Sequence, residues 1–264
     1  MILDELAQAT KARIQRHKEE MPLSEVRAIA ESMENDGSFP FRAALEKEGM
    51  SFICEVKKAS PSKGLIAPDF PYLDIAREYE EAGAAAISCL TETDFFLGSD
   101  EYLRQIAQKV SIPVLRKDFT VDEYMIFEAK TLGASAILLI CTLLERETLR
   151  YYLEIAHSIG LSALVETHDE AEMESALYSG ADIIGVNNRN LKDFTVDIDT
   201  AVRLRALAPS DKIFVAESGI KNAEDVARLY ENNCSAVLIG ETLMRSDNKR
   251  AALEELRCKL PGKA

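Results

Sequence analysis

The chain has 264 residues, 47% of them hydrophobic, and a formal net charge of −14. A chain of this length and apolar content can bury one large core, so we expect a single domain over residues 1–264. The negative charge disfavours nucleic acid and anionic membranes as partners, and it requires any anionic substrate to be held by a local positive site. Five cysteines without a C-x-x-C pair indicate neither a zinc knuckle nor a disulfide framework.

Targeting and membrane signals are not evident in the sequence. Segment 1–6 lacks a basic region followed by an apolar stretch, so we predict no signal peptide. The longest apolar run, 134–144, is well short of the roughly 20 residues that a membrane-spanning helix needs. We therefore expect a cytoplasmic protein.

Residues 1–48 are charge-rich and favour helix, without a β-branched run. We interpret them as a helical extension that precedes a barrel over 49–264. A turn is predicted at 35–38, followed by a short helix over 41–47. The first helix carries a loose apolar stripe of Ile2, Leu3, Leu6, Ala9 and Ile14.

From residue 52 onward, short β-branched apolar runs alternate with amphipathic segments, the pattern of a parallel sheet covered by helices. Four of the amphipathic segments end in Gly or Asn, which can adopt the left-handed conformation that turns the chain back into the sheet. Eight such runs predict an α/β fold of the closed (β/α)8 TIM-barrel type, although a doubly wound open sheet would give a similar pattern. The predicted strands are 52–57, 86–90, 114–117, 135–141, 163–167, 183–186, 213–217 and 236–239.

Charged side chains are concentrated where the predicted strands end, which is where barrel enzymes build their active sites. Glu55 and Lys57 lie on one side of the first strand, Lys117 ends the third, and Glu166 lies near the end of the fifth. Charged residues in apolar runs are rarely buried unless they are paired or functional. We expect these two lysines and two glutamates to converge at the mouth of the barrel. The alternative is that they form ion pairs that merely close the top of the barrel.

Two glycines follow the last two predicted strands, in Ser218-Gly219-Ile220 and Ile239-Gly240-Glu241. In phosphate-binding barrels these loops present backbone N–H groups to the anion, and glycine lets the backbone approach it closely. Either glycine alone would fit a plain turn equally well. The two positions together predict a phosphate site.

Other loops offer further candidates. Segment 57–64 is basic and rich in hydroxyls, so it is either a lid that reaches an anionic substrate or a solvated turn. Phe95, Phe96 and Phe119 follow strands and would line an aromatic pocket or pack under the helices. The three histidines do not cluster, and we expect His168 to be solvated rather than a ligand. We expect no metal, and without a G-x-G-x-x-G motif we expect no nicotinamide cofactor.

Six segments occur in the order and spacing of the motifs of one enzyme family. The segments are Glu55-Val-Lys57-Lys-Ala-Ser60-Pro-Ser-Lys-Gly64, Arg116-Lys117-Asp-Phe119, Leu164-Val-Glu166, Gly185-Val-Asn187-Asn-Arg189-Asn-Leu191, Glu217-Ser218-Gly219-Ile220 and Ile239-Gly240-Glu-Thr-Leu-Met244. Through them the chain resembles the indole-3-glycerol-phosphate synthase family over residues 52–244, and its helical extension is also similar to that family's. Lys58, where the family often has Arg, and Glu123, where Pro is common, are departures outside the acid–base set.

The resemblance implies a carboxy-lyase that converts 1-(2-carboxyphenylamino)-1-deoxyribulose 5-phosphate into indole-3-glycerol phosphate, CO2 and water, a cofactor-free step of tryptophan biosynthesis. It implies that Lys117 is the general acid of ring closure and that Glu166 stabilises the positive charge developing on the anilinic nitrogen. Glu55 and Lys57 are the implied acid–base pair of the dehydration. We expect burial or the nearby Lys57 to lower the pKa of Lys117 toward neutrality, with Glu166 opposing the shift.

The resemblance also implies the substrate contacts. Asn187 and Ser218 would orient the substrate with Arg189 near its carboxylate, while Lys57, Gly219 and Gly240 would hold the phosphate. The pocket would be shaped by Ser60, Ser88, Leu90, Phe96, Phe119 and Leu138.

Two other functions fit a phosphate-binding barrel. A Schiff-base aldolase would use a strand-end lysine as nucleophile. A non-catalytic barrel would bind its ligand without turnover, but we would expect it to lack one of the four acid–base residues, and this chain has all four. No exposed apolar stripe stands out, so we expect a monomer.

Overall fold

The computed structural model describes residues 2–190 and 193–261. Eight parallel strands form a closed barrel in which β1 pairs with both β4 and β10. This closure confirms the predicted (β/α)8 barrel and excludes the open sheet. Each of the eight barrel strands begins and ends within one residue of its predicted range. The strands are β1 (Ser51–Val56), β4 (Ala86–Leu90), β5 (Val114–Lys117), β6 (Ala136–Ile140), β7 (Ser162–Thr167), β8 (Ile183–Asn187), β9 (Ile213–Glu217) and β10 (Ala236–Ile239).

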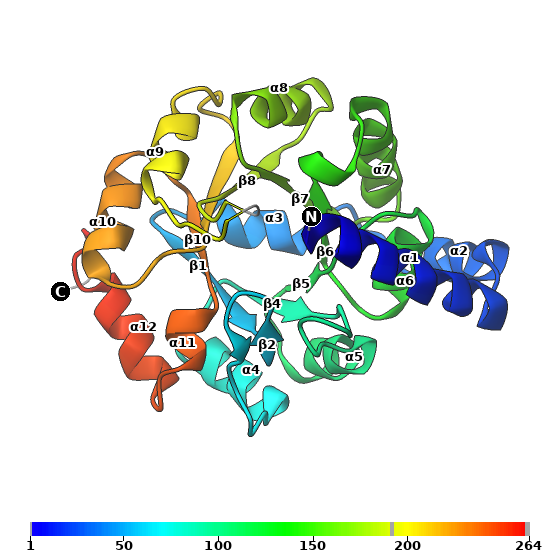
Figure 1. Cartoon of the computed structure of the whole chain (residues 1–264), viewed down its shortest axis with the longest axis horizontal. Coiled ribbons are helices and arrows are strands. Elements are labelled where there is room, and N and C mark those ends of the chain that lie inside the picture. Colours follow the sequence, from blue (N-terminus) through cyan, green and yellow to red (C-terminus); the bar gives the residue numbers. More distant parts are fainter. Residues whose placement is uncertain (1, 191–192, 262–264) are drawn as a thin grey trace.

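Helices surround the barrel on all sides (Figure 1). The turns between helix and strand use the predicted left-handed residues, with φ of 80° at Gly83 and 61° at Asn233. Along the described parts of the chain, no helix is both long and apolar enough to cross a bilayer. The helices that follow the strands are α4 (Tyr72–Glu81), α5 (Asp100–Lys109), α6 (Tyr124–Thr131), α7 (Arg146–Ser158), α8 (Glu170–Tyr178), α9 (Asp199–Arg205), α10 (Ala223–Glu231), α11 (Glu241–Met244) and α12 (Lys249–Arg257), with a 3-10 turn η1 (Cys141–Leu143) after β6.

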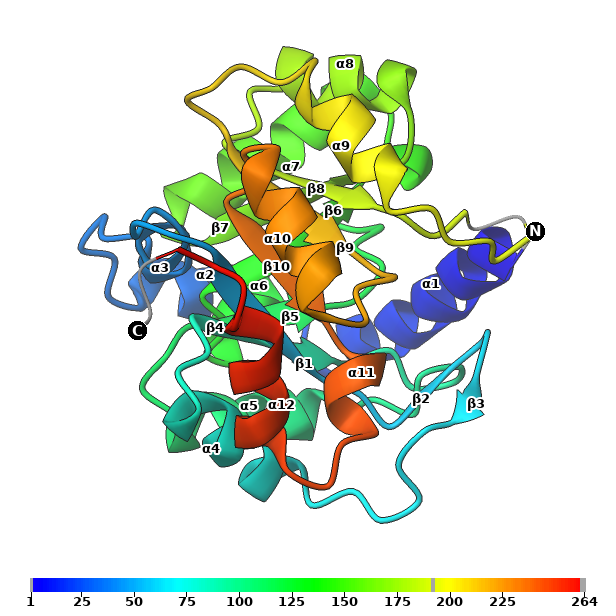
Figure 2. The same cartoon turned by 90° about the vertical axis from the view of Figure 1, so that its left-hand side faces the viewer.

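The helical extension consists of α1 (Ile2–Glu20), α2 (Leu23–Ser32) and α3 (Pro40–Leu45). Figure 2 shows α1 and α3 at opposite ends of the barrel. Phe41 and Leu45 of α3 are buried against inward-facing strand residues and close one end of the barrel core. The short helix predicted over 41–47 is present, beginning one residue and ending two residues earlier, and it forms the base of the barrel.

The other end of the barrel carries the loops that follow the strands. Helix α1 begins there, on the same side as a small hairpin of β2 (Ala59–Ser60) and β3 (Gly64–Leu65) (Figure 2). Leu3, Leu6 and Ile14 of the predicted stripe are buried, at the spacing expected for one helix face. The extension thus closes the base with α3 and lays α1 over the mouth.

Candidate active site

A cavity of about 620 Å³ opens at the C-terminal ends of the strands. Its walls come from strand ends, from the loops after β1, β8, β9 and β10, and from the start of α1. This is the position at which barrel enzymes bind their substrates. The predicted site residues that line it are Glu55, Lys57, Ser60, Leu90, Phe96, Lys117, Phe119, Leu138, Glu166, Asn187, Arg189, Ser218, Gly219 and Gly240.

Ser88 is the predicted site residue that does not line this cavity. It is fully buried on β4, two residues before Leu90, so it faces the barrel interior one pleat deeper. Its hydroxyl has no hydrogen-bond partner among the described residues. That Ser88 shapes the substrate pocket stays a prediction.

Five charged side chains, here called the mouth cluster, meet at the floor of the cavity: Glu55, Lys57, Lys117, Glu166 and Glu217. Lys57 Nζ lies 2.5 Å from Glu55 Oε1. Lys117 Nζ lies 3.4 Å from Glu166 Oε2 and 3.5 Å from Glu217 Oε2. All five side chains are at most 16% exposed. The predicted convergence is present, and its ion pairs line an open cavity instead of sealing it.

Glu166 is the most strongly held carboxylate of the mouth cluster. Its Oε1 accepts a hydrogen bond from Asn187 Nδ2 at 3.2 Å and lies 3.3 Å from His168 Nε2. Burial alone would raise the pKa of Glu166, but Lys117, His168 and Asn187 together lower it to about 2. Glu166 is therefore an anion throughout the working pH range.

The pKa of Lys117 is raised, whereas we expected it to be lowered. Burial does lower the pKa of its ammonium, but Glu166, Glu217 and Glu55 outweigh burial and hold that pKa well above its ordinary value. The expectation counted one opposing carboxylate where the fold supplies three. Before substrate binds, Lys117 is thus a fully protonated donor, as a general acid must be.

Glu217 belongs to the cluster but was not among the predicted site residues. Burial raises the pKa of Glu217 to about 8, with Lys117 opposing the shift and the other two carboxylates adding to it. Its Oε1 has no hydrogen-bond partner among the described residues. The signal that could have identified it is positional, because Glu217 ends β9 as Lys117 ends β5.

His168 follows β7 and is not solvated, contrary to expectation. Its side chain is 16% exposed and stands between Glu166 and Glu172 of α8. The packing of α8 against the barrel removes the ring from water.

Of the two predicted phosphate loops, the one that carries Gly240 lies beside Lys57. A Cβ at Gly240 would collide with Glu55 Oε1 and lie 2.8 Å from Lys57 Nζ, so a side chain there would displace the ends of both charged groups. Ser218 and Gly219 have φ of 66° and 82°, and a Cβ at Gly219 would also collide with Val196. Ser218, Gly219 and Gly240 all line the cavity, and a phosphate site at these loops stays a prediction.

Segment 57–64 is an ordered wall of the cavity, not a solvated turn. It forms the β2–β3 hairpin, and Ser60 and Pro61 line the cavity. Lys63 Nζ pairs with Glu241 Oε1 of α11 at 3.3 Å. The hairpin is thereby tied to the loop that carries Gly240.

Apolar side chains also line the cavity and are here called the apolar wall. The rings of Phe96 and Phe119 are 6.0 Å apart, centre to centre, while Phe95 does not line the cavity. Three residues of α1 complete this wall, a role that the sequence did not reveal, since their stripe only predicted a packed helix: Ile2, Leu3 and Leu6.

The polar side of the cavity includes the segment after β8. Asn187 Oδ1 accepts the backbone N–H of Arg189 at 3.0 Å, and Arg189 Nη1 donates to Phe194 O at 3.3 Å. Asn187 is therefore fixed at both ends of its amide. Leu191, the last residue of this motif, lies outside the described residues.

Comparison with known proteins agrees with this geometry. The family model described as indole-3-glycerol phosphate synthase matches residues 3–256. The chain belongs to the indole-3-glycerol phosphate synthase family. Proteins of that name from Ruminiclostridium cellulolyticum and Endomicrobium trichonymphae are 56% and 52% identical over 257 residues. These matches cover 97% of this chain and 99% and 100% of the two relatives, so the family and function predicted from the motifs are confirmed.

Solved structures of low identity share the barrel. A 3-hexulose-6-phosphate synthase has a TM-score of 0.64 at 14% identity and covers 79% of this chain and 99% of its own. A thiamine phosphate pyrophosphorylase from Pyrococcus furiosus has a TM-score of 0.58 at 18% identity, with 79% of this chain and 94% of its own covered. These two similarities concern the fold alone.

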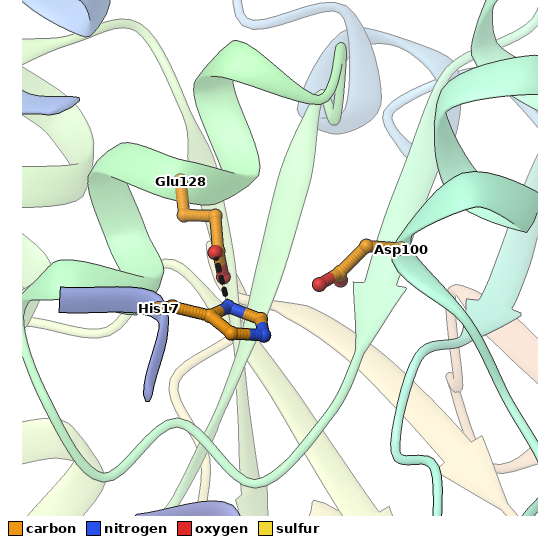
Figure 3. A group of neighbouring side chains, drawn as sticks. All are labelled: His17, Asp100 and Glu128. Atoms are coloured by element: carbon orange, nitrogen blue, oxygen red, sulfur yellow. Dashed lines mark hydrogen bonds and ion pairs between the residues drawn. The ribbon is translucent and has the colours of Figure 1, made fainter. Parts of the chain in front are cut away.

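A second buried charge cluster lies on the outer side of β5 in this member of the indole-3-glycerol phosphate synthase family. Within it His17, Asp100 and Glu128 place potential metal-ligand atoms near one another (Figure 3). Arg116 Nη2, however, lies 2.8 Å from Asp100 Oδ1 and 2.7 Å from Glu128 Oε2, so a guanidinium already bridges the two carboxylates. The group is an ion-pair network, and that no metal is needed stays a prediction. The whole set is here called the outer cluster: Arg13, His17, Asp100, Arg116, Asp118 and Glu128.

Proposed function

We propose that this chain is a carboxy-lyase that converts 1-(2-carboxyphenylamino)-1-deoxyribulose 5-phosphate into indole-3-glycerol phosphate, CO2 and water at the mouth cluster. One observation supports this most directly: Lys117 Nζ contacts both Glu166 and Glu217 in a cavity that is also lined by the apolar wall and by the predicted phosphate loops. An aromatic ring, a reacting carbonyl and a phosphate need these three environments.

Ring closure joins an aryl carbon to the substrate carbonyl carbon. Lys117 donates its proton to the carbonyl oxygen as the new C–C bond forms, because it is the buried ammonium at the cavity floor. The ring nitrogen becomes a cationic imine, and the anionic Glu166 stabilises that charge. The carboxylate then leaves as CO2 and its bonding electrons neutralise the iminium, so the substrate supplies its own electron sink.

Dehydration needs an acid for the departing hydroxyl and a base for the ring proton. Glu55 and Lys57 form this pair, with their charged atoms 2.5 Å apart beside Gly240. Lys57 also faces the phosphate loops, so it couples phosphate binding to the second half of the reaction.

Substrate orientation is divided among the walls. Asn187, Ser218 and Arg189 hold the polar groups, with Arg189 nearest the carboxylate that leaves. Gly219 and Gly240 present their loops to the phosphate. The aromatic ring packs against the apolar wall of Leu90, Phe96, Phe119 and Leu138, with Ser60 at the hairpin edge.

The test measures turnover of the carboxyphenylamino-deoxyribulose phosphate by the purified protein, followed by fluorescence. The buffer contains a metal chelator and no added cofactor. The unmodified chain should produce indole fluorescence, and Lys117→Met should be slower by about 10³-fold or more. Lys109→Met, an exposed lysine at the end of α5, is the matched control and should retain full activity. Near-normal turnover by Lys117→Met would overturn the assignment of the acid.

Two outcomes would overturn the reaction itself. Substrate bound by both proteins without turnover would indicate a non-catalytic barrel. A borohydride-trapped adduct on a strand-end lysine would indicate a Schiff-base aldolase.

We also propose that the chain acts as a monomer in the cytoplasm. The large exposed apolar side chains of the described residues are distributed over α2, β3, α7, α8 and several loops. Spread in this way, they do not form the continuous apolar patch that a subunit interface needs. Light scattering on the purified chain should give the mass of one copy, 29.3 kDa.

A further inference from the structure

His168 connects the mouth cluster to α8. Its Nε2 lies 3.3 Å from Glu166 Oε1, and its Nδ1 lies 2.9 Å from Glu172 Oε2. The Glu166 and Glu172 side chains are 3% and 17% exposed. The imidazole therefore bridges a carboxylate inside the cavity and one outside it.

Glu172 is a fixed anchor for this ring. Its Oε2 also accepts the backbone N–H of His168 at 2.8 Å, and its Oε1 accepts the hydroxyl of Thr142 at 2.5 Å. The backbone N–H of Glu172 donates to Asp169, the N-cap of α8, at 2.9 Å. A carboxylate with several donors has little freedom, so the helix start sets the orientation of the ring.

Each ring nitrogen lies within ion-pair distance of a carboxylate oxygen, although Nε2 makes no aligned hydrogen bond to any described residue. Two flanking carboxylates favour an imidazolium with a proton on each nitrogen. Burial alone would lower the pKa of His168, but Glu166 and Glu172 raise it to about 10. The other ionisable groups around this carboxylate pair are Lys117 on β5, Glu217 on β9, Cys141 on η1 and Asp169 at the start of α8.

We propose that His168 is a positioning residue for the reaction, an imidazolium fixed by Glu172 that holds Glu166 in place while Lys117 gives up its proton. The proposal rests on the proposed roles of Lys117 and Glu166. Glu166 has one cation at each oxygen, Lys117 at Oε2 and His168 at Oε1. When Lys117 becomes neutral during ring closure, His168 is the cation that remains, so Glu166 stays anionic at the moment when the substrate nitrogen becomes positive.

Two variants and a matched control test the proposal through the pH dependence of kcat. His168→Gln should lower kcat by about 10- to 100-fold at every pH, with KM changed by less than about threefold. Glu172→Gln should be nearly normal near pH 6 and lose about tenfold by pH 9, because His168 without its anchor loses its proton in that interval. Glu174→Gln, on the same helix with a side chain 72% exposed, should match the unmodified chain at both pH values.

Histidine NMR gives a readout that does not depend on turnover. The sequence has three histidines, so three labelled imidazoles are expected, and His168 is identified by removing His17 and His157 one at a time. In the unmodified chain His168 should remain protonated through about pH 9. In Glu172→Gln its titration should move below that value and coincide with the new loss of kcat.

The proposal is wrong if His168 titrates in the ordinary range in the unmodified chain, or if His168→Gln folds and retains its kcat. If His168→Gln does not fold, the Glu172→Gln profile and the spectra decide. An unmodified chain that makes no product refutes the proposed function instead, while the spectra still show whether Glu172 fixes the ring.

Discussion

Strand β5 carries two adjacent cations that face opposite ways, Lys117 into the mouth cluster and Arg116 into the outer cluster. Arg116 donates to Asp100, Glu128, Thr91 and a backbone carbonyl at 2.7–3.2 Å. Lys117 has two carboxylates at 3.4 and 3.5 Å and lines an open cavity. Arg116 is held by short hydrogen bonds, while Lys117 keeps longer contacts that a substrate can replace.

The outer cluster stabilises the fold, whereas the mouth cluster is placed to take part in the reaction. The outer cluster joins α1 to the barrel, since Arg13 donates to Asp118 and His17 lies 2.6 Å from Glu128. Every carboxylate in it has a cation. In the mouth cluster Glu166 and Glu217 share Lys117, and Glu217 remains protonated near neutral pH with its pKa raised to about 8. On the cavity side of β5, the pKa of a buried carboxyl group is therefore raised into the neutral range.

The largest expected effect follows from removing the guanidinium. Arg116→Met should lower the free energy of unfolding by about 3–5 kcal/mol, because it leaves Asp100 and Glu128 buried without their cation. Denaturant titration measures the loss.

Lys117→Met should change that free energy much less, since Glu166 keeps His168 and Asn187 as partners. Arg104→Met, which removes an exposed pair with Glu101, is the control. If Lys117→Met destabilised the fold as much as Arg116→Met, the two clusters would not differ in kind.

A second prediction divides the mouth cluster by reaction step. Glu55→Gln should slow the dehydration by about 100-fold while ring closure continues, because Glu55 pairs with Lys57 and not with Lys117. Quenched single-turnover samples should then contain a decarboxylated, still hydrated intermediate. Glu241→Gln lines the same cavity outside the cluster and should accumulate none. Loss of all binding by Glu55→Gln without an intermediate would contradict the division.

A third prediction concerns stability against pH. The pKa of Glu217 is about 8 in the fold, above its ordinary value of 4.5, so the unfolded chain releases this proton first as pH rises. The native state is therefore penalised progressively between those two values. Glu217→Gln removes the penalty, and its gain in unfolding free energy should be small near pH 4 and reach about 1–3 kcal/mol near pH 8.

Glu128→Gln is the matched change in the outer cluster. Burial raises the pKa of Glu128, but Arg116 and His17 lower it to about 2, so this carboxylate stabilises the fold above pH 4.5. The variant should be less stable than the unmodified chain at pH 8. If Glu217→Gln and Glu128→Gln changed the unfolding free energy at pH 8 in the same direction, the two clusters would hold their carboxylates in the same way.

The sequence was sufficient for the barrel and for most of the cavity lining, because both depend on local pattern. Alternating apolar runs fix the strands, and a strand-end residue such as Glu55 or Lys117 must face the mouth if its strand belongs to a barrel. The direction of the Lys117 pKa shift could not be predicted, because it depends on how many carboxylates other strands bring to one ammonium. The i, i+4 spacing of His168 and Glu172 was a visible signal of pairing. Nothing local connects Arg13 or His17 with partners about a hundred positions later.

The smallest expected effect tests whether the outer cluster reaches the cavity through α1. The hydrogen bond to Glu128, together with the charges of Glu128 and Asp100, raises the pKa of His17 against the opposing effect of burial. A raised pKa means that the stabilisation is complete below the ordinary value of 6.5 and is lost as pH rises through the folded value. His17→Gln should therefore cost about 1 kcal/mol near pH 6 and almost nothing at high pH, as measured by thermal unfolding.

The same variant should loosen the start of α1, whose Leu3 and Leu6 line the cavity. Its KM should then rise by about two- to threefold near pH 6, with kcat unchanged, because the apolar wall is less well ordered when the substrate arrives. His157→Gln on α7 is the control of opposite sign, since burial lowers the pKa of His157 and its neutral form is the one that suits the fold. That variant should gain stability relative to the unmodified chain as pH falls and should leave KM unchanged. A KM effect of equal size in both variants would mean that α1 is held by its apolar stripe alone, and that the outer cluster serves the barrel without reaching the substrate.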